Sequence, residues 1–465
     1  MKHRSVNKNF IRILFLFLLI ITIVFSNGDV KDNTKEIESL KEFKEWLVNN
    51  NAYINPNIDI ELLDKYGRSI VAKKSIKKQD KLISIPKDII MSNIGGYPKK
   101  IPKEIYEQVQ SIGLSPTNLQ AVFIMYSKLN EKSFWHPYVT VLPESFSTSL
   151  YFSDNELDEL QASQLKEFTI IRKDGIERHY ESTFSRLSKL VPEFSNLALY
   201  NQELFTWALS CVWSRAFSLA ENDGGMVPLA DMFNAEDRSK SKVLPKVTDT
   251  TLDYYASDDI AEGEQIFTPY GVYKPLSSSQ MLMDYGFIFD EGTVSDNVAI
   301  TVPVFHNDEP NLSTKQEILE ENDIINEVFL LQKTDPLPAD LLLYARVKNL
   351  IAKECDQAKK HFLSPNTRNT PLNTRNEKVS LRFLENLIHR YLDSYGTNLE
   401  SDKNLLKNYY SSDNNNNNNN DNNSVDNNQI SFNVINAIKI RIMEKEILIS
   451  ALNIIEKARS ELINN

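Results

Sequence analysis

The side chains with the strongest potential for chemistry lie between Met226 and Phe287. The stretch opens with an apolar run over residues 226–235, which only Asp231 and Asn234 interrupt with polar side chains. A buried polar group without a hydrogen-bond partner costs a few kcal/mol, so both side chains need partners. The pattern therefore predicts a polar binding site in an apolar setting. For each residue alone a local role is the alternative: Asn234 can cap a turn and Asp231 can pair with a nearby backbone amide.

Arg215 precedes this stretch on an expected helix. Residues 203–217 have a helical period, and Ala208, Cys211, Val212 and Arg215 follow one another at i, i+3, i+4 and i+7. This spacing puts Arg215 on the apolar face. A buried arginine needs a carboxylate partner, and Asp231 is a candidate for an internal salt bridge.

Three aromatic residues beside glycines close the stretch. Tyr270 precedes Gly271, while Tyr285 and Phe287 flank Gly286. Taken one at a time, such aromatic side chains more often pack in a core than line a ligand site. Their position after an expected hairpin favours the ligand site for the group.

In combination these motifs resemble the SET-domain methyltransferases, and most of all the branch that resembles the Rubisco large-subunit methyltransferase. The resemblance covers the chain from about Phe43 to near the C-terminus. It is carried by several ordered motifs, namely residues 228–234, 263–267, 270–271 and 285–287, together with 133–138, 142–143 and 214–217.

The resemblance implies an α+β fold, in which a SET-domain β-fold is split by a helical insertion and followed by an all-α C-terminal substrate-binding domain. The SET domain is expected over 35–305, with the insertion at about 100–215, and the helical domain over 306–465. The implied activity is methyl transfer from S-adenosylmethionine to a side chain of a protein substrate, with lysine as the expected acceptor. We expect a monomer.

The resemblance also implies the site residues. Tyr270 matches the catalytic tyrosine, whose hydroxyl would orient the acceptor amine. Arg215 matches an arginine that holds the methionyl carboxylate of the cofactor, which is the alternative to its internal salt bridge. The expected cofactor-binding residues are Tyr66, Gly67, Arg68, Arg215, Asp231, Asn234, Ala235, Tyr270, Tyr285, Gly286 and Phe287.

The chain departs from the family pattern at three places. Ser69 stands where the family has the second glycine of a Gly-x-Gly turn, and Ala235 stands where it usually has histidine. The spacer 272–284 is a few residues longer than usual. These departures support an alternative function, a SET-fold protein-binding module with little or no turnover.

The expected elements would position these residues. Strands are predicted over 58–63, 69–76 and 81–85, then around 252–256, from which a hairpin through 265–268 delivers Tyr270, and over 297–305. Helices are predicted over 35–48, from Ser115-Pro116 onward, and over 338–351, 379–392 and 434–462. An Asn/Asp tract is predicted as a disordered loop over 411–429.

Charge and cysteine content exclude other classes. The net charge of −11 argues against a nucleic-acid partner, because phosphate binding depends on clustered Lys and Arg. Cys211 and Cys355 are far apart and form neither a disulfide framework nor a metal-binding motif. No metal site is expected.

The N-terminus has a composition of its own. Four basic residues precede the apolar run 13–25, which is typical of a secretory signal peptide or short signal anchor over residues 1–26. The run is shorter than a full membrane span, so cleavage is favoured. The sequence therefore predicts entry into the secretory pathway, with membrane contact only if the segment stays uncleaved, whereas the family resemblance alone suggests cytosol or nucleus.

Overall fold

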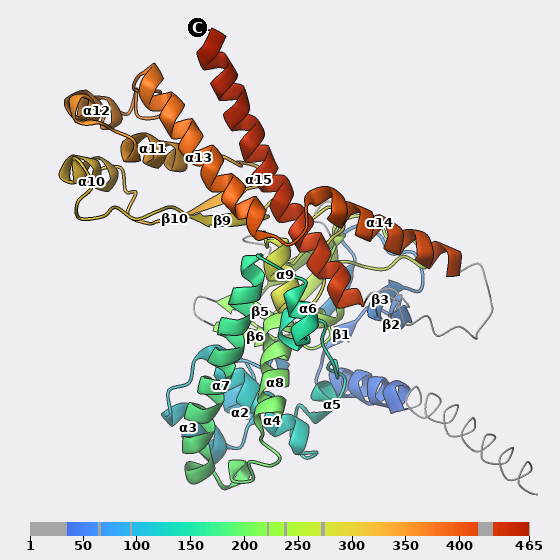
Figure 1. Ribbon diagram of the computed structural model, residues 1–465. Helices are drawn as coiled ribbons and strands as arrows, with labels where there is room; N and C mark the ends of the chain where they lie inside the picture. Colours follow the sequence, from blue (N-terminus) through green and yellow to red (C-terminus); the bar gives the residue numbers. More distant parts are fainter. Residues whose placement is uncertain are drawn as a thin grey trace, which may run out of the picture. The chain divides into compact units, whose positions relative to one another are not determined.

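The computed structural model describes residues 35–63, 67–93, 95–220, 223–236, 240–270, 275–416 and 431–464 (Figure 1). The chain divides into two compact units, each built from two segments. The first unit comprises Met1–Ser145 and Glu177–Pro269, and the second comprises Phe146–Ile176 and Tyr270–Asn465. The two units are defined by their compactness alone. The predicted boundary between a SET domain over 35–305 and a helical domain over 306–465 therefore stays a prediction.

A four-stranded antiparallel sheet forms the centre of the first unit. Its strand order is β1 (Tyr53–Ile54), β4 (Lys81–Pro86), β8 (Thr251–Ala256) and β7 (Val243–Val247). Leu252, Tyr254 and Ala256 alternate along β8 and are all buried, as their period of two predicts.

Two hairpins accompany this sheet. One pairs β2 (Ile58–Leu63) with β3 (Gly67–Ala72), and the other pairs β5 (Ala216–Ala220) with β6 (Asp223–Met226). Strand β3 ends at Ala72, four residues before the predicted end. The predicted hairpin through 265–268 is absent from the described residues; instead, Gln265 bridges to Val71 and Thr268 bridges to Ala235.

Helix α4 (Pro116–Leu129) is the most deeply buried helix described in the first unit, because every residue from Asn118 to Ser127 is buried. Ser115 accepts a hydrogen bond from the Asn118 amide and Pro116 occupies the first turn, so the predicted helix start is confirmed. Helix α8 ends at Arg215, and the residues after it enter β5, not the predicted last helical turn. The unit contains a helix over 35–49, α2 (Tyr97–Lys100), α3 (Lys103–Ser111), α4 (Pro116–Leu129), α5 (His136–Val139) and α8 (Gln202–Arg215), with η1 (Lys87–Ile89), η3 (Pro192–Phe194) and η4 (Ala230–Met232).

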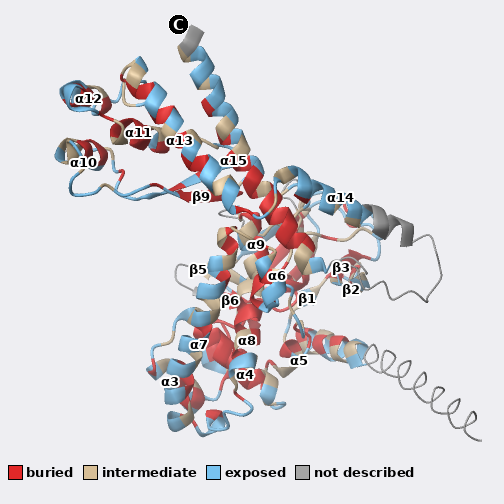
Figure 2. Ribbon diagram, in the orientation of Figure 1, coloured by how far each residue is buried: buried red, intermediate tan, exposed pale blue. Residues whose placement is uncertain are grey.

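The second unit is mostly helical. Its core consists of aliphatic and aromatic side chains, with leucine and isoleucine prominent among them. Helix α13 (Thr374–Ser394) shows the expected amphipathic pattern, with buried and exposed residues alternating along it (Figure 2). The helices are α6 (Asp154–Asp158), the first part of α7 (Gln164–Leu190), α9 (Ser278–Asp284), α10 (Leu312–Glu320), α11 (Ala339–Lys348), α12 (Cys355–Phe362), α13 (Thr374–Ser394), α14 (Leu399–Asn416) and α15 (Phe432–Asn464), with η2 (Ser149–Tyr151) and η5 (Ala352–Glu354).

A two-stranded antiparallel sheet also belongs to this unit. It pairs β9 (Asn297–Thr301) with β10 (Val328–Gln332). The sequence predicted β9 but not β10, which lies inside the segment expected to be all-α. Its residues Val-Phe-Leu-Leu-Gln are apolar and short, and such a run does not separate strand from helix by periodicity alone.

Several predictions fall on parts of the chain that the structure does not describe. The signal segment 1–26 and residues 417–429 of the Asn/Asp tract lie outside the described residues. Helix α14 continues to Asn416, so the predicted loop 411–429 begins later than expected. Within the described ranges, no helix combines the length and apolar character needed to cross a membrane.

Candidate functional site

Asp231 is the centre of a buried polar cluster in the first unit. Its Oδ2 accepts hydrogen bonds from the Tyr138 hydroxyl at 2.7 Å and from Arg215 Nη1 at 3.2 Å. Arg215 Nη1 also donates to the Asp231 backbone carbonyl at 2.8 Å. Burial raises the pKa of the Asp231 carboxyl, while the charge of Arg215 opposes this shift. The internal salt bridge considered for Arg215 is therefore present in the structure.

A second cation lies next to this cluster. Arg68, from β3, donates from Nη1 to the Val141 carbonyl and has Nε 3.4 Å from a carboxyl oxygen of Glu36. Burial lowers the pKa of the Arg68 guanidinium, and repulsion from Arg215 lowers it further. Arg68 pairs with Glu36 and Arg215 pairs with Asp231, while the two guanidinium groups still repel each other, so an anionic ligand beside both would relieve that repulsion.

Asn234 connects three segments of the first unit. Its Nδ2 donates to the Arg68 carbonyl at 3.1 Å and to Ser69 Oγ at 2.9 Å. Gln265 Nε2 donates to the same Ser69 oxygen at 3.0 Å, and the Thr268 amide donates to the Asn234 carbonyl at 3.0 Å. Ser69, which replaces an expected glycine, is thus a buried acceptor that joins β3 to residues 265–268.

The backbone before Asp231 is strained. Leu229 has φ +70° and ψ −41° although its side chain is buried and branched. Non-glycine residues seldom adopt this region, and such strain persists only where the surrounding structure enforces it. The bend lets the 3₁₀ turn η4 place Asp231 beside Arg215.

Ala235 follows Asn234 with its side chain buried and its backbone paired with Thr268. An alanine side chain has no polar group, so any role of this position in ligand binding belongs to the backbone. Gly67 begins β3 with φ +62°, and a Cβ at this position would meet no atom within 4 Å, so glycine is favoured here by the left-handed backbone and not by close packing. Tyr66 lies outside the described residues.

The aromatic residues form a separate cluster in the second unit. The rings of Tyr270 and Tyr285 lie 4.7 Å apart at 37°, and the ring of Phe287 lies 6.4 Å from each of them, close to perpendicular. Burial raises the pKa of the Tyr285 hydroxyl, and neighbouring Tyr270 adds to the shift. Tyr285 therefore stays protonated and remains a neutral hydrogen-bond donor at physiological pH.

Gly286 fixes the position of this cluster. It has φ +82°, and a Cβ there would lie 2.9 Å from backbone atoms of Ser147 and Thr148. Only glycine fits a left-handed position that other backbone approaches so closely. Tyr285 and Phe287 are thereby held on either side of a bend packed against residues 147–148.

The predicted site residues thus form two groups. Within the first unit the structure brings together Gly67, Arg68, Arg215, Asp231, Asn234 and Ala235, and within the second it brings together Tyr270, Tyr285, Gly286 and Phe287.

Sequence reasoning assigned no role to Tyr138, Ser69 or Gln265 in these bonds. Tyr138 carried a usable signal, because a tyrosine at the start of the mostly apolar run 138–142 needs a partner for its hydroxyl. No pattern pointed to Ser69 or Gln265, since they meet only through the fold. In the described part of the chain, no three His, Cys, Asp or Glu side chains lie close enough to hold a metal ion.

Known proteins share this architecture. The family model described as Rubisco LSMT substrate-binding matches residues 306–448. An actin-histidine N-methyltransferase from Rhinolophus ferrumequinum is 26% identical over 433 residues, which cover 89% of this chain and 68% of that protein.

Two solved structures support the fold. The SET domain of LSMT bound to lysine and AdoHcy has a TM-score of 0.68 at 22% identity, covering 91% of this chain and 92% of that one. Rubisco LSMT bound to AdoMet has a TM-score of 0.69 at 22% identity, covering 91% and 93%. The resemblance found in the sequence is confirmed at the level of the fold: the chain has the SET-domain fold of Rubisco LSMT, and its residues 306–448 match the Rubisco LSMT substrate-binding family model.

Proposed function

We propose that the chain is an S-adenosylmethionine-dependent protein N-methyltransferase. The observation that carries this proposal is the cluster of Arg68, Arg215 and Asp231 in the first unit. Its two guanidinium groups repel each other, and the carboxylate of a methionyl group would relieve that repulsion. Asp231 Oδ1 is buried without a hydrogen-bond partner among the described residues, so the cluster also contains an acceptor for an ammonium group. The donor set therefore fits a zwitterionic ligand.

The protein's part in the reaction is to position two ligands and to exclude water. When bound, the cofactor supplies an electrophilic methyl group on a sulfonium. Arg215 and Arg68 would hold its carboxylate, and the Tyr270 hydroxyl would orient the acceptor nitrogen toward the methyl group. Tyr285 and Phe287 would cover the reacting groups with apolar surface, which favours an uncharged nitrogen.

The acceptor is a protein side-chain nitrogen, and lysine and histidine are both candidates. The sequence predicted lysine, which matches the lysine bound in the LSMT structure. The curated relative named above methylates histidine of actin. A histidine ring has a pKa of about 6.5 and is mostly neutral at pH 7, whereas lysine, with a pKa of about 10.4, must first lose a proton. The described residues of the aromatic cluster offer no carboxylate base for that step, which makes histidine the first acceptor to test.

Two measurements test the proposal. Calorimetry with S-adenosylmethionine should give one binding site, and tandem mass spectrometry after incubation with a protein extract should locate a methylated lysine or histidine. Lack of cofactor binding by folded protein would overturn the enzyme proposal. Cofactor or protein binding without any methylated product would support the alternative, a binding module without turnover.

We also propose that residues 1–26 direct the chain into the secretory pathway, which would restrict its substrates to lumenal or secreted proteins. Subcellular fractionation of a C-terminally tagged chain, with N-terminal sequencing, tests this. Cytosolic protein that retains Met1–Ser26 would contradict it.

A further inference from the structure

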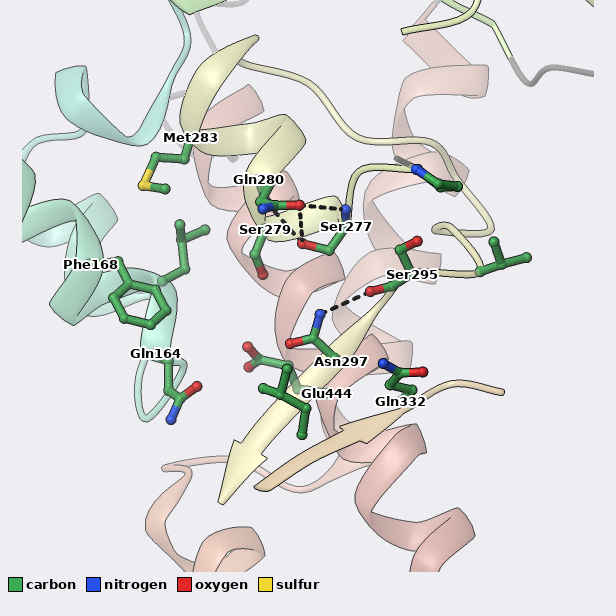
Figure 3. Close-up of a pocket in the computed structure, with 14 residues that line it drawn as sticks. Gln164, Phe168, Ser277, Ser279, Gln280, Met283, Ser295, Asn297, Gln332 and Glu444 are labelled. Atoms are coloured by element: carbon green, nitrogen blue, oxygen red, sulfur yellow. Dashed lines mark hydrogen bonds between the residues drawn. The ribbon is translucent and has the colours of Figure 1, made fainter. Parts of the chain in front are cut away.

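A cavity of the second unit lies apart from the aromatic cluster. Its volume is about 350 Å³, and it is lined by the start of α7, by α9 with the residues before it, by the β9–β10 sheet and by α15 (Figure 3). Nothing in the proposed transfer reaction uses it.

The lining offers hydrogen-bond acceptors and a single acid. Gln164 Nε2 donates to the Ala299 carbonyl and Asn297 Nδ2 donates to the Ser295 carbonyl, so these contacts fix which end of each amide is oxygen. Gln164 Oε1 and Asn297 Oδ1 accept no hydrogen bond from any described residue. Glu444 is the only charged residue among those that line the cavity, and none of the described lining residues is basic.

These features are complementary to a cation. A guanidinium or ammonium group has only donors, and the cavity presents amide oxygens and one carboxyl group. Glu444 accepts hydrogen bonds from Ser163 Oγ and Tyr395 Oη, both at 2.7 Å, and burial raises its pKa to about 7. A bound cation would stabilise the ionised form of this carboxyl group.

One wall of the cavity is an unprotected strand edge. The Val302 amide donates to the Glu327 carbonyl, and the Lys333 amide donates to the Asp296 carbonyl. In this register the backbone N–H and C=O groups of the odd-numbered residues of β10 point toward β9. The backbone groups of Val328 and Leu330 therefore point away from β9. Gln332 bonds to Asp335, but the N–H and C=O of Val328 and Leu330 have no partner among the described residues.

One edge strand of the four-stranded sheet in the first unit, β7, differs in this respect. Strand β7 contains Pro245 and Lys246, which prevent pairing with another chain. Strand β10 has neither a proline nor a charged residue. Its side chains Val328 and Leu330 are about half exposed, as is Phe168 at the cavity, and Val294 is exposed further. An apolar unprotected edge beside a cavity is the arrangement used for recognition of an extended peptide.

We propose that the edge of β10 binds an extended segment of the protein substrate as an added antiparallel or parallel strand, and that the cavity receives an arginine or lysine side chain of that segment. Residues opposite each other on neighbouring strands lie about 5 Å apart, and a long side chain reaches further. A basic residue opposite Leu330 is therefore placed to enter the cavity, which Leu330 itself lines.

Helix α9 connects the cavity to the aromatic cluster, and this connection is the reason for choosing the methyl-accepting protein as the ligand. Ser279, Gln280 and Met283 of α9 line the cavity, and Tyr285 is the residue that ends this helix. Its seven residues span about 10 Å, which an extended chain covers in three residues. This choice of occupant rests on the proposed methyltransferase function, whereas the peptide-binding step itself does not.

The first test measures binding directly. The probe is a fluorescein-labelled heptapeptide, Thr-Val-Thr-Arg-Thr-Val-Thr with blocked ends, titrated with the whole chain by fluorescence anisotropy. Replacing arginine by citrulline keeps the shape and removes the charge, and should weaken binding about tenfold, as one charge-assisted hydrogen bond would. N-methylation of the valine amides removes strand donors from the peptide and should weaken binding by a similar factor.

Variants of the protein give a matched comparison. Leu330→Pro copies the proline that protects β7 and should weaken binding about tenfold or more, because it removes an edge N–H. Leu330→Thr keeps that N–H and the strand preference and should change affinity less than about threefold. Glu444→Gln should remove the preference for arginine over citrulline.

The results separate this proposal from the proposed function. No binding of the arginine peptide, or binding that neither Leu330→Pro nor peptide N-methylation weakens, overturns the docking proposal. Equal binding of the arginine and citrulline peptides overturns the cation cavity. All of these peptide affinities are measured without cofactor. Absence of S-adenosylmethionine binding would therefore overturn the methyltransferase proposal and leave the peptide-binding results unaffected. If methyl transfer to a protein is found, Leu330→Pro should raise KM and leave kcat within about twofold.

Discussion

The two groups of candidate residues are built in opposite ways. In the first unit Arg215, Asp231 and Asn234 are joined by hydrogen bonds to each other or to Tyr138 and Ser69. In the second unit the rings of Tyr270 and Tyr285 lie at a tilt to each other, the ring of Phe287 makes T-shaped contacts with both, and a bend at Gly286 holds them.

This difference assigns different tasks to the two units. A charged, hydrogen-bonded cluster can bind a charged ligand. An aromatic cluster can instead shape the space around a reacting nitrogen and exclude water from it. We therefore expect changes in the first unit to alter cofactor affinity together with stability, and changes in the second to alter turnover or local packing.

The largest expected effect comes from Tyr270→Phe, which removes one hydroxyl from the aromatic cluster. Methyl transfer should fall about 10²–10³-fold, the usual cost of losing one hydrogen bond made in the transition state. Affinity for S-adenosylmethionine should stay within about threefold. Single-turnover kinetics and calorimetry check the two parts, with Tyr255→Phe, a tyrosine of β8 outside both clusters, as the control. Full activity in Tyr270→Phe would move the catalytic role elsewhere.

Arg215→Ala should separate the two tasks within the first unit. It leaves the buried Asp231 carboxylate without its cation, which should destabilise the fold by about 3 kcal/mol. If Arg215 also holds the cofactor, the shift of the melting temperature produced by S-adenosylmethionine should shrink as well. A lower melting temperature with an undiminished ligand shift would restrict Arg215 to its salt bridge. Arg215→Lys is the control that keeps the charge.

Gly286→Ala tests whether backbone packing sets the aromatic cluster. Its Cβ would meet the backbone of Ser147 and Thr148 at 2.9 Å in a left-handed position, so stability should fall by about 2–3 kcal/mol. Gly263→Ala is a matched control, because Gly263 has φ +79° but no atom within 4 Å of the added carbon. It should cost only about 1 kcal/mol, the strain alone. Equal losses in urea unfolding would show that close packing at Gly286 is unimportant.

The smallest expected effect concerns Glu444. Its folded-state pKa of about 7 is above that of a free carboxyl group, so the folded state holds this proton more tightly than the unfolded state. The resulting stabilisation is fully present below the unfolded-state pKa of about 4.3 and is lost as the pH rises from there through the folded-state pKa of about 7. Between pH 6 and pH 8 it should fall by about 1 kcal/mol. Glu444→Gln cannot lose the proton, so its unfolding free energy should lack this component. Parallel pH profiles for both proteins would contradict the assigned pKa.

Much of the fold followed from local signals. The strand over 58–63, the capped start of α4 and the amphipathic helices α13 and α15 follow from alternation, capping and helical period, which depend on neighbouring residues only. Strand β10 could not be predicted in this way. Its five residues form a strand because they pair with β9, about thirty positions earlier in the chain.

The site was predictable in its residue types but not in its connections. Helical spacing placed Arg215 on the buried face and named Asp231 as a possible partner, which the structure bears out as a salt bridge. The shared acceptor Ser69 was missed, because Asn234 and Gln265 reach it from segments about 165 and 196 residues away. Ser69 stands where the family has a glycine, and its hydroxyl oxygen accepts the hydrogen bonds from Asn234 and Gln265.

The division of each compact unit into two chain segments has a consequence for synthesis. A ribosome that has finished Met1–Ser145 must add all of Phe146–Ile176, which belongs to the other unit, before it returns to the first. Residues emerge at about 5–20 per second, so the first unit waits for seconds with an incomplete sheet, since β7 and β8 come last. The edge of β4 that later pairs with β8 is unpaired during that interval. Nascent chains of this protein are therefore expected to depend on chaperones until Pro269 has emerged.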